Sequence, residues 1–512
     1  MDGGPSGVCN RHAPNHLAKN TEVKSLLRER KQIGIAAACV VLIYGCAEDP
    51  NQGPASNGEK NSREAAQPNV LLIAVDDLND WVGYTGAHPD TRTPNIDALA
   101  QRGTAFTQAY SQYPLCGPSR ASLFAGLLPS TLGLYRHPRP DDLVVEAAEK
   151  HDTVLMHTFF RENGYKTMAA GKLMHRHVPE GSVDLSDARR SWDRMPDGNR
   201  VNFSSDGTMT DWGPFPGPEA EMSDPMTAEW AVQRLQENHE DPFLLMVGFI
   251  RPHVPWHVPQ EYFDLFGDAK ELTLPPYRAD DLDDVSAYAQ KTNTRAEMPR
   301  TPWLIRNDVW HDMVQAYLAS VNFADHYVGQ VLDALENSPY ADNTIIVLFS
   351  DHGYLLGEKN TTQKHSLWER ANKVPLIIAG PGLPKGERRA QTVGLLDIYP
   401  TLLDLANLPA NPVNEGHSLK PILDDEGIDW DFPTITQYRL EDEGTDFHGQ
   451  TVQSGPWRYS LYGDGSEELY NHQDDPNEWT NLAANPETRE QHSELIESLK
   501  DQLPTGFFTA AL

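Results

Sequence analysis

The sequence predicts an α/β fold with a large mixed, mostly parallel sheet flanked by helices, and a smaller C-terminal subdomain that contains an antiparallel sheet. Residues 69–75, 243–249 and 344–350 are continuous apolar runs, the pattern of strands that are buried on both faces of a parallel sheet. Residues 309–335 repeat apolar side chains at three- and four-residue spacing, which predicts a long amphipathic helix on the core. Beyond about residue 380 the strands become shorter and hairpin-like.

The remaining elements follow from periodicity and from local start and stop signals. Pro94 at a first helical position and Gly103 after the last one bound a helix, for example. Residues 279–300 are acidic and polar, which indicates a surface excursion. We expect helices at residues 93–102, 154–163, 226–236, 397–406 and 487–503, and strands at residues 166–170, 374–379, 457–462 and 467–471.

The length and the charge of the chain limit its domain organisation and its partners. The 512 residues suffice for one large domain with a smaller companion, which we expect at residues 68–380 and 381–512. With 42 basic and 74 acidic residues, the formal net charge is −32. Such a chain repels polyanions and offers no counterion-release affinity, so we expect no nucleic-acid partner. An anionic substrate needs local cations or a metal ion to overcome this field.

The first 46 residues predict export. An uncharged apolar run at residues 33–44 is too short to span a bilayer, but it follows basic residues as the core of a signal peptide does. The run ends in a segment that resembles a bacterial lipobox, which predicts lipidation of Cys46; an ordinary cleaved signal peptide is the alternative. Residues 47–67 are a polar tether. We expect a periplasmic protein or an outer-membrane lipoprotein that touches the membrane only through its lipid anchor.

Cys116 is the one cysteine of four that lies in the globular part, so the folded body has no disulfide framework. Pro118 marks the start of a helix and places Cys116 beside a helix N-terminus, where free N–H groups favour anions such as sulfate or phosphate. Arg120 adds a permanent cation with a planar fork. The alternative is a small buried cysteine in a strand-to-helix turn.

Acidic residues follow two of the predicted strands. Asp76 and Asp77 come directly after the first buried strand, and Asp351 and His352 come after residues 344–350. If these strands are parallel neighbours, the four side chains reach one edge of the sheet, where functional residues of open α/β sheets gather. Three carboxylates suit a hard cation such as Ca²⁺ or Mg²⁺, although histidine is a less typical ligand. The alternative is a set of turn and helix-capping acids.

Further polar residues follow other strands. Lys172 and His175 come after residues 166–170, and His253 follows another buried strand between two prolines that restrict its backbone. Such lysines and histidines are usually surface groups, but a pocket would form at these strand ends. Residues 179–225 have little periodicity and predict a long loop that shapes this pocket.

The segment from Cys116 to Arg120, Cys-Gly-Pro-Ser-Arg, resembles the signature of the type I, formylglycine-dependent sulfatases, and the similarity extends from about Pro68 to about Asn481. The resemblance is closest to the iduronate-2-sulfatase branch, through the segments 76–77, 171–175, 251–255 and 350–353. It implies an alkaline-phosphatase-like sulfatase fold. It also implies hydrolysis of sulfate esters on a sulfated uronic acid or a related sugar of a polysaccharide or oligosaccharide.

The resemblance also implies the role of each site residue. A formylglycine-generating maturation enzyme would oxidise Cys116 to 3-oxoalanine, whose hydrate attacks sulfur while His253 protonates the leaving sugar alcohol. His175 would contact the hydrate, and the cations Arg120, Lys172 and Lys364 would stabilise the charge of the sulfate. The ligands of a calcium ion, with magnesium possible, would be Asp76, Asp77, Cys116, Asp351 and His352.

The chain departs from the family pattern after the signature. The family usually continues Leu-Thr-Gly-Arg, whereas residues 123–127 read Leu-Phe-Ala-Gly-Leu. Two other functions are compatible with the sequence. One is a phosphomonoester or phosphonate ester hydrolase of the same superfamily; the other is a polysaccharide-binding lipoprotein that holds a metal without turnover because Cys116 stays unmodified.

Overall fold

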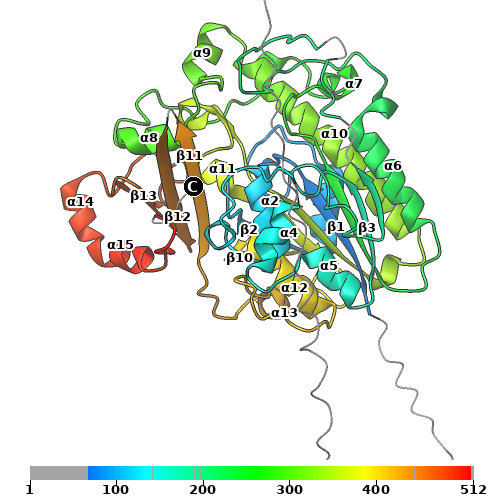
Figure 1. The fold of residues 1–512 in the computed structure, drawn as a ribbon. Helices are drawn as coiled ribbons and strands as arrows, with labels where there is room; N and C mark the ends of the chain where they lie inside the picture. Colours follow the sequence, from blue (N-terminus) through cyan, green and yellow to red (C-terminus); the bar gives the residue numbers. More distant parts are fainter. Residues whose placement is uncertain (1–66, 141, 189–190, 196–197, 443, 509–512) are drawn as a thin grey trace, which may run out of the picture. The chain divides into compact units, whose positions relative to one another are not determined.

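A large sheet of eight strands organises the part of the chain that the structure describes (Figure 1). Its strands, in spatial order, are β10 (Glu387–Gly394), β2 (Thr104–Tyr110), β9 (Lys373–Ala379), β6 (Thr344–Ser350), β1 (Asn69–Val75), β5 (Phe243–Phe249), β3 (Lys166–Gly171) and β4 (Leu185–Ala188). β1 pairs in parallel with both β5 and β6. β9 runs antiparallel to its neighbours β2 and β6. The predicted mixed, mostly parallel sheet is therefore confirmed.

The computed structural model describes residues 67–508 except 141, 189–190, 196–197 and 443. The predicted signal peptide, the lipobox cysteine Cys46 and the tether up to residue 66 lie outside these described residues. Within the described ranges, every helix is too short or too polar to cross a membrane.

Helices cover both faces of the large sheet, because the side chains of a strand alternate between its two faces. Leu71, Ile73 and Val75 of β1 point to one face, and Val70, Leu72 and Ala74 point to the other. The first face packs against α1 (Pro94–Arg102), α6 (Ser223–Leu235) and α10 (Trp310–Glu336). The second packs against α2 (Cys116–Ala125), α4 (Leu143–Glu149), α5 (Met156–Glu162), α12 (Ile398–Leu405) and α13 (Lys420–Asp424) (Figure 1).

A second, antiparallel sheet confirms the predicted C-terminal hairpins. Its strands, in order, are β11 (Thr434–Asp442), β12 (Thr445–Ser454), β13 (Trp457–Tyr462) and β14 (Glu467–Asn471). One face of this sheet packs on α15 (Ser493–Lys500). The small sheet begins only at Thr434, whereas β10, which also lies beyond residue 380, belongs to the large sheet.

Two expectations about the second half of the chain were wrong. The single helix expected at residues 487–503 is two helices, α14 (Pro486–Gln491) and α15, because the backbone at His492 leaves the helical region and its ring bonds to a carbonyl oxygen. The surface excursion expected at residues 279–300 contains α8 (Ala287–Asn293). The Asn293 side chain is fully buried. Its polarity is satisfied there, because its amide donates to the Tyr462 hydroxyl at 2.8 Å.

The parallel pairing places the ends of several strands side by side. β6, β1, β5 and β3 are consecutive neighbours that run in the same direction. Their carboxyl ends therefore share one edge of the sheet, and the residues that follow these strands can meet there.

Candidate functional site

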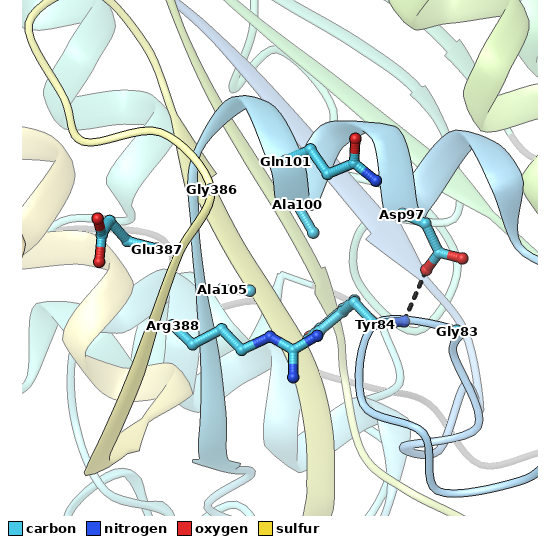
Figure 2. Close-up of a pocket in the computed structure, with 9 residues that line it drawn as sticks. All are labelled: Gly83, Tyr84, Asp97, Ala100, Gln101, Ala105, Gly386, Glu387 and Arg388. Atoms are coloured by element: carbon cyan, nitrogen blue, oxygen red, sulfur yellow. Dashed lines mark hydrogen bonds between the residues drawn. The ribbon is translucent and has the colours of Figure 1, made fainter.

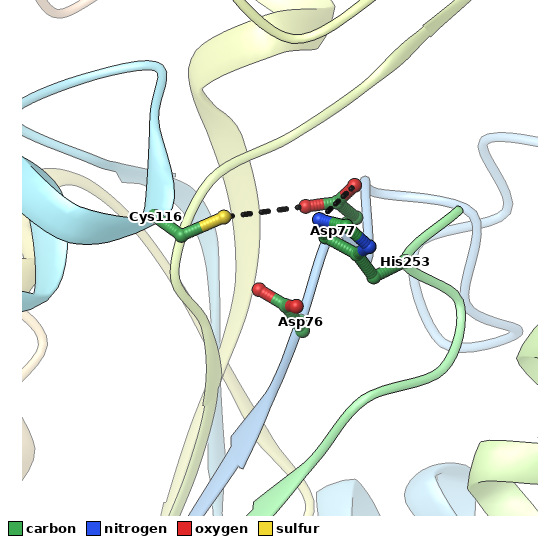
Figure 3. A group of neighbouring side chains, drawn as sticks. All are labelled: Asp76, Asp77, Cys116 and His253. Atoms are coloured by element: carbon green, nitrogen blue, oxygen red, sulfur yellow. Dashed lines mark hydrogen bonds and ion pairs between the residues drawn. The ribbon is translucent and has the colours of Figure 1, made fainter. Parts of the chain in front are cut away.

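The predicted site residues converge at this edge of the sheet. Asp76 and Asp77 leave the end of β1, and His253 lies in the loop after β5. Cys116 is the first residue of α2. Figure 3 shows these four side chains gathered around one space. Segments far apart in the sequence thus supply one cluster.

Cys116 lies at the centre of this cluster. Its Sγ is 3.1 Å from Lys364 Nζ, 3.2 Å from His352 Nε2 and 3.8 Å from Asp77 Oδ1. The residue is only 1% exposed, and this burial raises the pKa of its thiol. An unmodified Cys116 is therefore a neutral thiol near pH 7 and a poor nucleophile, since the thiolate is the reactive form.

Arg120 connects the acids of the cluster to the strand ends. Its Nε donates to Asp351 Oδ2 at 2.7 Å, and one terminal nitrogen donates to Asp76 Oδ1 at 3.2 Å. The other terminal nitrogen donates to the carbonyl oxygens of Lys172 and Leu173 at 2.5 and 2.9 Å. The guanidinium is buried, and all three of its nitrogens donate to the protein. In this arrangement Arg120 positions the carboxylates and does not reach into the cavity.

Asp76 is a carboxylate held by cations. Burial opposes its ionisation, but the charges of Lys172, Arg120 and Lys364 outweigh this effect and hold the pKa of Asp76 well below its usual range. Lys172 is fully buried, and its ammonium group donates to Asp76 Oδ2. The same ammonium lies 4.9 Å from the centre of the Trp192 ring.

Asp77 carries an oxygen that a cation would satisfy. Its Oδ1 accepts a hydrogen bond of 2.6 Å from Lys364, whereas its Oδ2 is buried and has no hydrogen-bond partner among the described residues. Burial raises the pKa of Asp77 in spite of the neighbouring Lys364. A buried carboxylate oxygen without a partner is costly, so this oxygen fits a bound cation.

The donor atoms around Asp77 form two overlapping sets. In each set the ligand atoms lie within 4.8 Å of one another: Asp76, Asp77, Cys116 and His253 in the first, and Asp76, Cys116, Asp351 and His352 in the second. The structure therefore brings together all five residues that were expected as metal ligands. Three carboxylates with an unpartnered oxygen fit a hard divalent ion.

His253 faces the cluster with one ring nitrogen. Its Nδ1 bonds to the carbonyl oxygen of Val254 at 2.6 Å, so Nδ1 carries a proton, and its Nε2 lies 3.9 Å from Asp77 Oδ2. Burial and the charge of Lys364 hold the pKa of His253 well below its usual value. His253 is therefore neutral at pH 7, and its Nε2 can exchange a proton.

Sequence reasoning missed the residues that hold His253. The Trp192 ring stacks on its imidazole, with centroids 4.6 Å apart and planes at 27°. Arg251 is fully buried and donates to the carbonyl oxygens of His253, His257 and Asp193 at 3.1 to 3.2 Å. Arg251 thus clamps the His253 loop against the long loop that carries Trp192. The only sequence signal for Trp192 was the length of that loop.

His175 lies beside the cluster without a hydrogen bond to Cys116 among the described residues. It stacks on His137, another residue that sequence reasoning missed, with centroids 3.6 Å apart. Burial lowers the pKa of His175 to about 3 and that of His137 to about 2. Both imidazoles are therefore neutral at pH 7.

The cluster opens into a cavity of about 490 Å³. His175, His253 and Lys364 line it, whereas Cys116 lies deeper. The long loop expected at residues 179–225 contributes Trp192, Arg194, Gly207, Thr208 and Met209 to the wall. This confirms that the loop shapes the pocket.

Leu127, the residue that departs from the family pattern after the signature, is part of the core. Leu127, where the family pattern has arginine, is 2% exposed and belongs to the apolar cluster on one face of the large sheet. Its carbonyl oxygen accepts a hydrogen bond of 2.6 Å from the Ser122 hydroxyl at the end of α2.

Comparisons with known proteins identify the family and the fold of the chain. Residues 68–408 match the sulfatase family model, and residues 357–504 match the model of the C-terminal part of N-sulphoglucosamine sulphohydrolase. A sulfatase of Formosa agariphila is 42% identical over 86% of this chain and 87% of its own length. Human iduronate 2-sulfatase is 31% identical, over 67% of this chain and 70% of its own length.

A solved structure supports the same architecture. The phosphonate monoester hydrolase of Silicibacter pomeroyi superposes with a TM-score of 0.69 over 85% of this chain and 94% of its own, at 22% identity. This likeness establishes the fold. The family model spans two thirds of the chain and includes every site residue described above. The chain therefore belongs to the sulfatase family, and it is a sulfuric ester hydrolase of the type I class.

Proposed function

We propose that this sulfatase removes the sulfate ester of an acidic saccharide, such as a sulfated uronic acid, with a nucleophile made from Cys116 and a calcium ion in the acidic cluster. The observation that carries the proposal is the position of Cys116 Sγ, which lies 3.1 to 3.8 Å from Lys364, His352 and Asp77. This position places the only cysteine of the described residues beside a cation and beside the proposed metal ligands.

The burial of Cys116 supports its modification, since a neutral thiol would not attack sulfur. A formylglycine at this position would supply a hydrated aldehyde, with one hydroxyl for attack and a second whose deprotonation allows sulfate to leave. Lys364 lies next to this position. Burial opposes its charge, but Asp77, Asp76 and Asp351 act together against this effect, and the pKa of Lys364 is raised well above its usual value. Lys364 can therefore stabilise negative charge on the ester oxygens as the transition state forms.

Asp76, Asp77, Asp351 and His352 would hold the metal ion together with residue 116. Calcium suits the three carboxylates best, although magnesium shares this preference for oxygen ligands. A divalent cation here would neutralise charge on the ester and favour ionisation of the attacking hydroxyl. Lys172 balances Asp76, and Arg120 keeps Asp76 and Asp351 in place.

His253 is the proposed acid for the leaving group. Its Nε2 faces the cluster while Nδ1 is held by the Val254 carbonyl, so the ring presents one nitrogen at a set orientation. An anionic ester in the cavity would favour the protonated ring. The stack of Trp192 on the imidazole and the clamp of Arg251 hold this orientation.

The same proposal covers maturation and location. A formylglycine-generating enzyme would have to oxidise Cys116, and the apolar run at residues 33–44 supports export, with Cys46 as the lipidated residue. The catalytic domain would extend beyond the expected boundary at residue 380, since β10 belongs to the large sheet, and the C-terminal subdomain would contain the antiparallel sheet that begins at Thr434. Labelling with a radioactive fatty acid tests the anchor, and a Cys46→Ala variant should lose the label.

Two measurements on the purified protein test the proposed function. The mass of the peptide that contains Cys116 should show the aldehyde instead of the thiol. Sulfate release should be measured on 4-nitrophenyl sulfate and on a sulfated uronic acid glycoside, in parallel with 4-nitrophenyl phosphate. We expect the sulfate ester to be preferred. An unmodified thiol without turnover would favour the binding-protein alternative, and a preference for the phosphate ester would favour a phosphoesterase.

A further inference from the structure

Three exposed arginines line the cavity above the cluster and take no part in the proposed chemistry. Arg139 follows α3 (Pro129–Leu132), Arg176 follows β3, and Arg194 lies in the long loop. All three line the same cavity as Lys364 and His253. Three separate segments thus place positive charge around one opening.

These arginines have no acidic partner in the part of the chain that the structure describes. None of them forms an ion pair there, and no described Asp or Glu lines the cavity. The Arg194 side chain donates a hydrogen bond to the Met209 sulfur, at 2.6 Å. In a chain with a net charge of −32, a cavity wall with three arginines and no carboxylate is a local reversal of the surface charge.

A neighbouring cavity provides the contrast. It has a volume of about 370 Å³ and shares five lining residues with the first cavity: Leu115, His137, Gly207, Met298 and His365. Its arginines are each paired with an acid: Arg136 with Glu441, Arg295 with Glu297 and Arg439 with Asp446. Its cations are thus neutralised by the protein, whereas Arg139, Arg176 and Arg194 are not.

The sulfate to be removed already has its own cations. Lys172 bonds to Asp76, and Lys364 lies at the bottom of the cavity beside Cys116 and Asp77. His137 and His175, which also line the cavity, are neutral because burial lowers their pKa values. The remaining charge of the wall is therefore that of the three arginines, and it faces whatever part of the ligand lies outside the cluster.

We infer that Arg139, Arg176 and Arg194 bind a second anionic group of the substrate, a carboxylate or another sulfate on the same or the adjoining sugar. This inference rests on the proposed function and names its substrate class: saccharides with at least two anionic groups. The guanidinium fork matches the paired oxygens of carboxylate and sulfate, and a charge-assisted hydrogen bond is stronger than a neutral one. Since the three side chains are exposed, they can act on substrate preference with little effect on the fold.

The test compares esters that differ in their second anion. 4-Nitrophenyl sulfate has one anionic group, a sulfated uronic acid glycoside adds a carboxylate, and a disulfated neutral glycoside adds a sulfate. In the combined variant Arg139→Gln, Arg176→Gln, Arg194→Gln, we expect kcat/KM for a dianionic ester to fall about 10- to 100-fold. At about 1.4 kcal/mol for each factor of ten, this loss corresponds to about 1.4 to 2.8 kcal/mol of binding free energy. The value for 4-nitrophenyl sulfate should stay within about twofold. The dianionic ester that loses more identifies the second anion.

Arg388 provides the matched control. It is exposed and lines a different cavity, where Asp97 and Glu387 lie in the same wall (Figure 2). Among the described residues it forms no ion pair. Arg388→Gln removes one surface charge of the same kind and should leave all three kcat/KM values unchanged.

Two outcomes would overturn the inference: a parent enzyme that does not prefer either dianionic ester, or a combined variant that keeps the preference. Neither outcome bears on sulfate hydrolysis itself. A parent without turnover of any sulfate ester would instead contradict the proposed function. In that case calorimetry of the same three compounds still decides the inference, because the parent should bind a dianionic compound more tightly than the combined variant does.

Discussion

The buried cluster and the wall of the cavity above it use positive charge in opposite ways. In the cluster, Arg120, Lys172 and Lys364 contact the carboxylates Asp76, Asp77 and Asp351. In the wall, Arg139, Arg176 and Arg194 have no carboxylate partner among the described residues and remain exposed. Each region contains three such cations, but only in the cluster is each cation paired with a carboxylate.

Solvation explains this difference. A buried charge without a partner is very costly, so the cations of the cluster require acids within hydrogen-bond distance. An exposed arginine keeps its water and needs no partner, so it remains available for a ligand. Burial with balanced charge therefore suits the cluster to the proposed chemistry and metal binding, whereas exposure suits the wall to the proposed selection of the substrate.

The largest loss of activity is expected when Cys116, the central side chain of the cluster, is replaced. Cys116→Ala removes the only source of the proposed nucleophile and should lower kcat/KM for 4-nitrophenyl sulfate by about 10⁴-fold or more, as loss of a nucleophile does in other hydrolases. The thermal midpoint should change little. Ser122→Ala, in the same helix, removes a hydrogen bond to Leu127 and should keep activity at a cost of about 1 kcal/mol in stability. Turnover by Cys116→Ala would reject the mechanism.

Removal of the metal should have the next largest effect. Asp77→Asn takes away the charge beside the unpartnered oxygen, so bound divalent metal, measured by mass spectrometry, should fall below one tenth of the parent's content, with activity falling in proportion. Treatment with a chelator should do the same, and calcium should restore activity better than magnesium.

Asp325→Asn is the control for the metal experiment. Asp325 is 1% exposed, but it accepts N–H bonds from Asn95 and Ile96 at the start of α1, away from the cluster. This variant should keep its metal and its activity. Equal metal content in Asp77→Asn and the parent would contradict the proposed ligand set.

A smaller, substrate-dependent effect is expected at His253. His253→Gln should lower kcat by about 10²- to 10³-fold for a sugar sulfate, whose alcohol leaves only when protonated, and by less than about tenfold for 4-nitrophenyl sulfate. His257→Gln, in the same loop but paired with Asp211 at 3.2 Å, should show no such dependence on the leaving group. Equal losses on both esters would argue that His253 acts only in binding.

The smallest effect concerns the neutral histidine pair between the cluster and the arginines. Burial lowers the pKa of His137 to about 2, so the folded state stays neutral while the unfolded chain takes up a proton below pH 6.5. His137 therefore costs stability as the pH falls. Between pH 8 and pH 5.5, the unfolding free energy of the His137→Asn variant should therefore fall by about 1 kcal/mol less than that of the parent. Urea unfolding at both pH values measures this difference. His326→Asn, at an exposed site, should leave this pH dependence unchanged; a change equal to that of His137→Asn would refute the explanation.

The local sequence determined the strands and the residues at their ends. The apolar runs of β1, β5 and β6 can only be buried on both faces, and the parallel direction of these strands brings Asp76, Asp351 and His253 to one edge. Position relative to a strand end thus predicted where the cluster forms. The role of each residue came from the resemblance of its motif to a known family, because charge and spacing alone leave the chemistry open.

Only the tertiary structure decided the surroundings of these residues. The reversed direction of β9, the stack of Trp192 on His253 and the stack of His137 on His175 each join segments with no shared periodicity. A sequence pattern reports the burial of a side chain, but not which distant group it meets. Whether an arginine is paired with an acid depends on such contacts between distant segments. The contrast between the balanced cluster and the arginines of the wall is therefore set by tertiary packing.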